Sequence, residues 1–166
     1  MARTDDQSAT RTPKLLIQAT VAIFVLRLVT VAVSAHAQPP AIAGIPWQDA
    51  AAIKVFPPAA QDKLVIYQFY AQWSDPCKRM EATSLRNQQI REMVQGSFLP
   101  VRVLDVSREK GKNPQYVADL EKRYRVFALP TLVVVGRDGE PLGSLIGDCS
   151  SLTTYRFLSR AMHNRS

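Results

Sequence analysis

The feature that most constrains this fold is an apolar run that leads directly into the start of a helix. The run, Leu64 to Tyr70, is rich in aromatic residues and is typical of a strand inside a sheet. Ser74 is a favourable N-cap for the helix that follows, and Pro76 suits its first turn. The sequence therefore predicts a strand that turns sharply into a helix from Asp75 to about Leu85, with Cys77 near its start.

Strands and helices alternate along the rest of the chain. Asn113-Pro114 is a good helix start, and Arg137-Asp138-Gly139-Glu140 is typical of a hairpin turn. Alternation predicts that the first two long strands are parallel, joined by a right-handed crossover, and that the final hairpin is antiparallel. We therefore expect an α/β fold, with a central mixed sheet and helices on both faces.

The remaining predicted elements are these. Strands are expected at Phe98–Asp105, Leu132–Val135 and Leu142–Ile146, and a charged loop at Arg108–Lys112. Helices are expected at Trp47–Val55, which Pro57-Pro58 would end, at Gln88–Gln95, and from Asn113-Pro114 to Tyr124. A last amphipathic helix is expected to turn Leu152, Tyr155, Leu158 and Met162 toward the core.

The first 37 residues have the pattern of a targeting segment. A polar, basic start precedes the largely apolar run Leu15–Val33, and Ala35-His36-Ala37 forms a small-x-small cleavage site. Residues 1–37 are predicted to be a secretory signal peptide cleaved after Ala37 or, alternatively, an N-terminal membrane anchor built from residues 15–35. Arg27 would cost about 2.5–3.5 kcal/mol at a bilayer centre, which favours the cleaved signal.

Both forms of this segment predict export to a periplasmic or other extracytoplasmic compartment. The anchor would in addition keep the segment in contact with a membrane. Residues 38–46 have the composition of a linker, and residues 47–166 would form the folded domain. The chain is therefore predicted to deliver one folded domain outside the cytoplasm.

Composition and charge exclude several classes of function. The net charge of +7 comes from 21 lysines and arginines against 14 acidic residues, and the basic residues are scattered among acids. A nucleic-acid-binding face needs clustered basic residues and stacking aromatics, so no nucleic-acid partner is expected. His36 and His163 lie near the chain ends and cannot complete a zinc site or a Ser-His-acid triad. The two cysteines exclude a disulfide-dense scaffold, and we expect no metal and no cofactor.

Two motifs in these elements resemble the thioredoxin superfamily. The first is Phe69-Tyr70-Ala71-Gln72-Trp73-Ser74-Asp75-Pro76-Cys77-Lys78 at the strand-to-helix turn, and the second is Ala128-Leu129-Pro130-Thr131 before the hairpin. Cys77-Lys78-Arg79-Met80-Glu81 and Phe98-Leu99-Pro100-Val101 are similar, more narrowly, to exported thioredoxin-like domains related to the C-terminal domain of transmembrane thiol–disulfide interchange proteins. The resemblance covers roughly residues 47–163 and implies a thioredoxin-like fold.

The resemblance also implies a substrate groove. In the family the peptide bond before the second motif's proline is cis and faces the active-site turn, which would make Leu129-Pro130 cis here. The alternative is an ordinary proline at the start of a strand. In the family the backbone beside this proline holds an extended substrate segment, so Trp73, Leu129 and Pro130 are the substrate-binding residues that the resemblance implies. The expected partners are exported proteins or peptides, alone or within a membrane redox or assembly complex.

Two departures from the family pattern affect the chemistry. Exchange begins with attack by a thiolate, which the first motif cysteine supplies from a helix N-terminus. Ser74 occupies this nucleophile position, where a hydroxyl is far less reactive toward sulfur and no histidine lies nearby in sequence. Gln68 replaces the buried acid that relays a proton in thioredoxins, and an amide cannot serve as a general base. We therefore expect Ser74 to act as the helix N-cap and standard dithiol exchange to be absent.

Several interpretations of the two cysteines stay open. Cys77 corresponds to the family's resolving position, so it is either a shielded core residue or the catalytic residue of a residual activity. Cys149, two residues after Gly147, is the candidate redox partner. It would act through a Cys77–Cys149 bridge, which needs Cα atoms within about 7 Å, or by pairing with another protein.

Together these features predict an exported thioredoxin-fold protein with a degenerate Ser-x-x-Cys motif. The leading hypothesis is a redox-inactive peptide-binding or assembly module that keeps the groove around Trp73, Leu129 and Pro130. The alternative is a thiol–disulfide oxidoreductase with residual activity through Cys77, Cys149 or both. A third hypothesis is a scaffold that the N-terminal segment recruits to a membrane complex.

Overall fold

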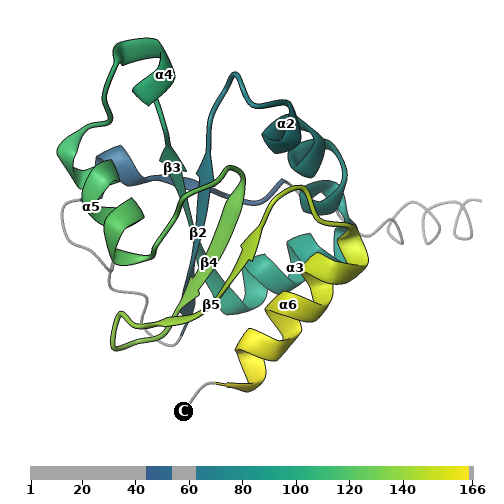
Figure 1. Cartoon of the computed structure of the whole chain (residues 1–166). Coiled ribbons are helices and arrows are strands. Elements are labelled where there is room, and N and C mark those ends of the chain that lie inside the picture. Colours follow the sequence, from purple (N-terminus) through teal and green to yellow (C-terminus); the bar gives the residue numbers. More distant parts are fainter. Residues whose placement is uncertain (1–43, 54–62, 165–166) are drawn as a thin grey trace, which may run out of the picture. The chain divides into compact units, whose positions relative to one another are not determined.

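A five-stranded sheet forms the centre of the structure, in the order β1-β3-β2-β4-β5 (Figure 1). This computed structural model describes residues 44–53 and 63–164; the predicted targeting segment, most of the linker and Pro57-Pro58 lie outside the described residues. The long strands β2 and β3 are parallel, β2 and β4 are antiparallel, and β4 and β5 form a hairpin. The predicted α/β fold with a mixed sheet is therefore confirmed. The strands are β1 Gln48–Asp49, β2 Leu64–Tyr70, β3 Phe98–Leu104, β4 Thr131–Val135 and β5 Pro141–Ile146.

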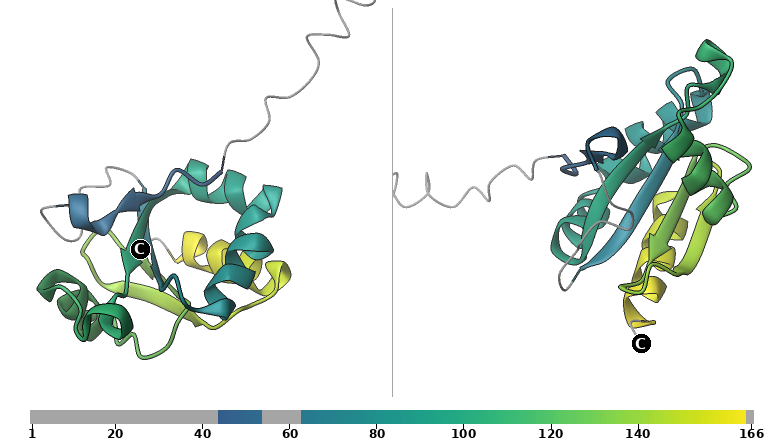
Figure 2. Two further views of the ribbon diagram at one scale, coloured as in Figure 1. Left: turned by 90° about the horizontal axis from the view of Figure 1, so that it is seen from above. Right: turned by 90° about the vertical axis from the view of Figure 1, so that its left-hand side faces the viewer.

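Helices cover both faces of this sheet. Figures 1 and 2 show α2, α3 and α6 on one side and α5 on the other, with α4 in the connection that leads to α5. Within the described part of the chain, none of these helices has the length and apolarity that crossing a bilayer requires. The helices are α2 Asp75–Ala82, α3 Gln88–Ser97, α4 Ser107–Lys110, α5 Gln115–Arg123 and α6 Ser151–His163, with 3₁₀ helices at Ala50–Ala52 and Ser84–Arg86.

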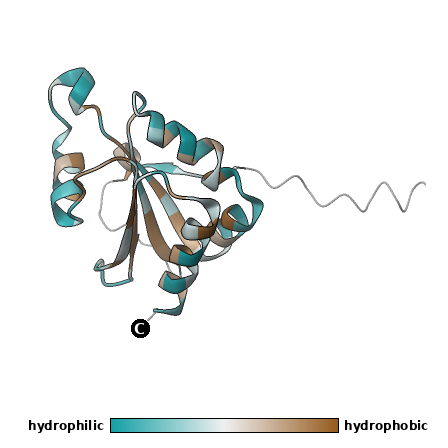
Figure 3. Cartoon of the chain, turned by 45° about the vertical axis from the view of Figure 1, so that its right-hand side comes forward, coloured by the Kyte–Doolittle hydropathy of each residue, from teal (hydrophilic) through white to brown (hydrophobic). Residues whose placement is uncertain are grey.

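Successive side chains of a strand point to opposite faces of the sheet, and they form two apolar cores, one on each face. In β2, Val65, Tyr67 and Phe69 pack with α5, whereas Leu64 and Ile66 pack with α2, α3 and α6. Figure 3 shows the same arrangement, with apolar strands at the centre and hydrophilic residues on the outer faces of the helices. Each large side chain buried in this way contributes about 1.5–3 kcal/mol to folding.

The predicted helix at Trp47–Val55 is wrong. Gln48–Asp49 forms a short strand that pairs in parallel with β3, and only Ala50–Ala52 turn as a 3₁₀ helix. Asp49 caps this turn, since its carboxylate accepts a hydrogen bond from the backbone N–H of Ala51 at 2.9 Å. Apolar spacing indicated a helix here, but the open edge of β3 offers backbone partners that the local pattern does not reveal.

Two smaller predictions also need correction. The expected charged loop at Arg108–Lys112 contains the short helix α4, which ends at Gly111 with a positive φ of 76°. The inner face of α6 is formed by Thr154, Leu158 and Ala161, while Leu152 and Tyr155 are exposed. Two of the four residues predicted to face the core do so, since Leu158 is buried and Met162 packs against the same core. Contact of α6 with β5 and α3 leaves the other two on the outer side.

Candidate functional site

The turn between β2 and α2 places Ser74 at the N-cap position. Its hydroxyl accepts a hydrogen bond from the backbone N–H of Cys77 at 3.4 Å, and the residue is only 3% exposed. Its carbonyl accepts the N–H of Lys78 at 3.1 Å, which starts the helix. Cys77 lies in the first turn and is 4% exposed. The Ser74 hydroxyl is therefore engaged in capping the helix, and the Cys77 thiol is buried.

A groove opens beside this turn. The Leu129-Pro130 peptide bond is cis, as the resemblance implied. The groove has a volume of about 420 Å³, and it brings together three of the predicted site residues, Trp73, Ser74 and Leu129. Cys77, Pro130 and Cys149 are not among its lining residues. The lining is Trp73, Ser74, Pro76, Asp105, Glu121, Val126, Phe127, Ala128 and Leu129.

Two carboxylates in this groove, Asp105 and Glu121, were not predicted from the sequence. Burial raises the pKa of Glu121 above its usual value, while a hydrogen bond from the Asn113 amide opposes this shift and the Asp105 charge adds to it. Arg108 of α4 lies over the ring of Trp73, with its guanidinium carbon 4.7 Å from the ring centre. The groove therefore combines apolar walls with negative charge, and the Trp73 face accepts a cation. No local spacing connects these residues, since they come from separate elements.

Gln68 is held by an arginine that sequence reasoning also missed. The two residues lie opposite each other in the parallel strands β2 and β3, and Nε of Arg102 donates to Gln68 Oε1 at 2.9 Å. The same guanidinium pairs with Glu81 of α2 and lies over the rings of Trp47 and Tyr70, at 5.1 and 5.3 Å. Gln68 is thus a buried amide whose oxygen is hydrogen-bonded to a positively charged side chain.

The loop that carries Cys149 is attached to Pro130 and to α2. The backbone N–H of Gly147 donates to the Pro130 carbonyl at 2.8 Å, and Arg79 pairs with Asp148 at 2.7 Å. Burial and the Asp148 carboxylate raise the pKa of the Cys149 thiol above its ordinary value, so the reactive thiolate is disfavoured. Cys77 and Cys149 are both free thiols in this structure.

Thiol accessibility gives a direct test of this arrangement. We expect iodoacetamide to modify Cys149 slowly in the native protein, because its raised pKa lowers the thiolate fraction, and to modify Cys77 only after denaturation. Mass spectrometry of non-reduced protein, before and after denaturation, measures both events. A disulfide that blocks both thiols, or rapid native modification of Cys77, would contradict the structure.

Comparisons with known proteins agree with the fold. The family model for a thioredoxin-like domain matches residues 50–158. Thioredoxin-1 of Drosophila melanogaster is 33% identical over 89 residues, which cover 54% of this chain and 71% of that protein. The reduced DsbD C-terminal domain of Neisseria meningitidis is 28% identical with a TM-score of 0.50, covering 60% of this chain and 82% of that chain. A thioredoxin from Thermus thermophilus, 24% identical with a TM-score of 0.50, covers 59% of this chain and 72% of its own and shows the shared fold.

Proposed function

Because this chain belongs to the thioredoxin-like domain family, we propose that it is an exported peptide-binding or assembly module that has kept the family's groove and lost thiol–disulfide exchange. The observation that carries this proposal is the state of Ser74, which caps α2 and lines the groove where the family has a reactive thiol. A serine hydroxyl there cannot form the mixed disulfide with which exchange begins.

The second support is the absence of a proton relay at Gln68. The amide of Gln68 accepts a hydrogen bond from Arg102, and it neither gains nor loses a proton near neutral pH, so it cannot relay one. Cys77 and Cys149 do not compensate, because the first is buried and the pKa of the second is raised.

The groove's chemistry indicates the kind of segment that it would hold. Trp73 is 41% exposed and Phe127 80% exposed, so apolar side chains of a partner could bury against both. Asp105 and Glu121 favour a partner with a positive charge, and a basic side chain of that partner would have to displace Arg108 from the face of Trp73. We therefore infer an extended segment that combines apolar and basic side chains.

Export is the second part of the proposal, and it rests on the targeting pattern of residues 1–37, which lie outside the described residues. A mature protein whose mass corresponds to a chain that starts at Gln38 would support the cleaved signal. Retention of residues 1–37 in a membrane fraction would favour the anchor instead. Recovery of the full-length protein in the cytoplasm would contradict both.

Insulin reduction tests the loss of exchange. We expect the purified domain to reduce insulin no faster than dithiothreitol alone, because no thiol lines the groove. Turbidity of the insulin B chain measures the rate. Turnover above this background that disappears in Cys77→Ala would contradict the proposal and support the residual oxidoreductase.

Peptide binding tests the retained groove. We expect a fluorescein-labelled peptide in which leucine alternates with lysine to bind the domain, and Trp73→Ala to weaken this binding by about tenfold. Its affinity should fall as the pH is lowered through the raised pKa of Glu121, because protonation removes one of the groove's negative charges. Glu121→Gln should weaken binding at neutral pH and reduce the pH dependence. If Trp73→Ala weakened binding of an alternating leucine–glutamate peptide as much as binding of the leucine–lysine peptide, the charge preference of this groove would be contradicted.

A further inference from the structure

The edge strand β5 leaves part of one face of the sheet uncovered. Among the described residues, β5 pairs only with β4, so its other edge offers unpaired backbone groups. The apolar core under α5 includes residues of β2, β3 and β4, and none from β5 among the residues described. The residues of α5 in this core, Val117 and Leu120, therefore pack over β2, β3 and β4 and, in the part of the chain that the structure describes, leave β5 without a helix on this face.

A cavity of about 600 Å³ lies beside β5 on this face of the sheet. Tyr124 and Val133 are buried residues at its base, while Phe127 and Ile146 are 80% and 43% exposed at its margin. Exposed apolar side chains beside a concave surface are typical of a binding site. The cavity is lined by Arg123, Tyr124, Arg125, Phe127, Thr131, Val133, Glu140, Pro141, Gly143, Ser144 and Ile146.

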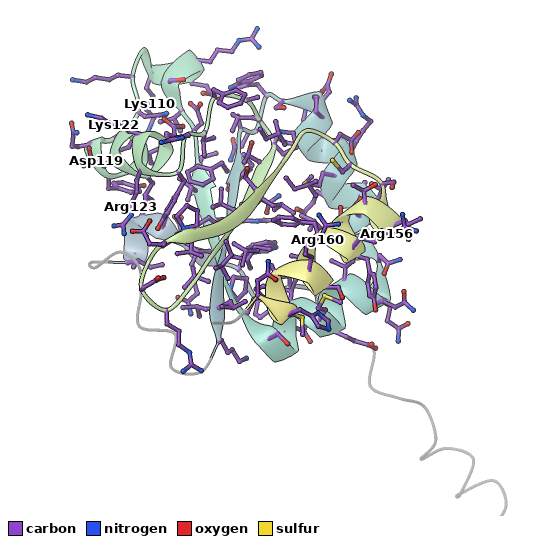
Figure 4. All side chains as sticks on the ribbon, turned by 60° about the horizontal axis from the view of Figure 1, so that its bottom comes forward. Lys110, Asp119, Lys122, Arg123, Arg156 and Arg160 are labelled. Carbon is purple, nitrogen blue, oxygen red and sulfur yellow. The ribbon has the colours of Figure 1, made fainter. Side chains whose placement is uncertain are left out.

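Basic residues lie on both sides of β5. Arg123 and Arg125 line the cavity on the α5 side, and Arg156 and Arg160 project from α6 (Figure 4, which labels three of these four). All four are exposed, and none forms an ion pair within residues 63–164. Glu140 is the acidic residue in the cavity lining.

One of the two cavity arginines, Arg123, is held in place by contacts of its guanidinium. Nη2 of Arg123 donates to the Gly139 carbonyl at 3.1 Å, and its guanidinium carbon lies 5.6 Å from the centre of the Tyr124 ring. Arg125 has a positive φ of 53°, a backbone conformation that non-glycine residues rarely adopt. A guanidinium that is held in place loses less conformational freedom when it binds a carboxylate.

We propose that β5 and this cavity form a second docking surface, which binds an extended acidic protein segment as an additional strand. The segment's backbone would pair with the free edge of β5, as in other cases of strand addition. Because side chains alternate between the two faces of a strand, its carboxylates would enter the cavity and meet Arg123 and Arg125. Its apolar side chains would then lie on the opposite face of the sheet, which α6 covers.

This surface is distinct in charge from the groove beside Trp73. That groove contains Asp105 and Glu121, whereas the β5 cavity contains Arg123 and Arg125; Phe127 lines both. A basic segment and an acidic segment should therefore select different sites on the same domain. The two proposals fail independently, because neither Ser74 nor Trp73 belongs to the β5 surface.

The test uses the full chain and a short fluorescein-labelled peptide in which valine alternates with glutamate. We expect the wild-type protein to bind this probe with an affinity that falls as salt is added. The double variant Arg123→Ser, Arg125→Ser should weaken binding by about tenfold or more. The control Lys110→Ser, Lys122→Ser removes the same charge from residues outside the cavity lining, labelled in Figure 4, and should change the affinity less than about twofold.

A second pair of probes separates strand addition from general attraction by charge. Two versions of the peptide carry N-methyl groups on alternate backbone amides, one on the odd and the other on the even positions. Only the version that methylates the amides facing β5 should fail to bind. Bound probe should also slow hydrogen exchange in residues 141–146. Equal binding of both methylated probes, or an equal loss in the lysine control, would overturn the proposal. The proposal would also be overturned if the wild-type protein bound no probe while the arginine variant self-associated. The arginines would then only prevent the edge of β5 from pairing with another copy of the chain.

Discussion

Replacing Ser74 with cysteine is expected to introduce a reversible disulfide with Cys77 and insulin reduction about tenfold or more above background. The N-terminus of α2 is preserved in this domain, so a thiol at position 74 would lie where the helix dipole lowers thiol pKa values. The mutation replaces one small polar side chain by another and keeps the exposed Trp73 beside it. Thiol titration and the insulin assay measure the two effects.

Two matched variants control this experiment. Ser74→Ala removes the cap without adding a thiol, and should lower stability by about 1 kcal/mol while the activity stays at background. Adding Cys77→Ala to Ser74→Cys should abolish the gained turnover, because no resolving thiol remains. If Ser74→Cys forms no disulfide with Cys77, the turn does not keep the family's geometry and the retained-groove proposal loses its main support.

Replacing Arg102 with methionine is expected to lower the free energy of unfolding by about 2–3 kcal/mol. The substitution removes the hydrogen bond to the buried Gln68 side chain and leaves the amide oxygen unsatisfied. It also removes the guanidinium from the rings of Trp47 and Tyr70. Urea denaturation measures the loss.

A double-mutant cycle identifies the cause of this loss. Gln68→Met removes the buried amide, so the combined variant with Arg102→Met should recover about 1 kcal/mol or more relative to the sum of the single changes. Arg79→Met is the surface control, because Arg79 also forms an ion pair but its side chain is 59% exposed. It should cost less than about 1 kcal/mol. Additive effects of Gln68→Met and Arg102→Met would contradict the coupling seen in the structure.

Much of the fold could be predicted because short local sequence patterns specify its main helices and strands. The apolar run at Leu64–Tyr70 forms β2 over the same residues, and Ser74 and Pro76 begin α2 as their capping preferences predict. The Asp138-Gly139 turn likewise joins β4 to β5. The helix expected near Trp47 failed because pairing with β3, far along the chain, outweighed the local spacing.

The candidate site was predictable only in part, for a related reason. Ser74, Cys77 and Leu129-Pro130 belong to short motifs, whose roles follow from local chemistry and from the family resemblance. Gln68 was visible as a neutral residue in an apolar strand, but its partner Arg102 is set by the register between β2 and β3. The groove's carboxylates and the arginines beside β5 come from elements that only the folded chain brings near these strands.

Local chemistry therefore determined the strand and the capped helix that follows it, whereas the groove was expected only from the family resemblance. Tertiary structure alone decided the charge of each surface, because charge complementarity depends on distances between side chains that sequence spacing does not specify. It also decided which strand lies at the edge of the sheet, since the order of the strands places β5 last. Ser74 thus lines a groove that contains two carboxylates, while the cavity beside β5 contains two arginines.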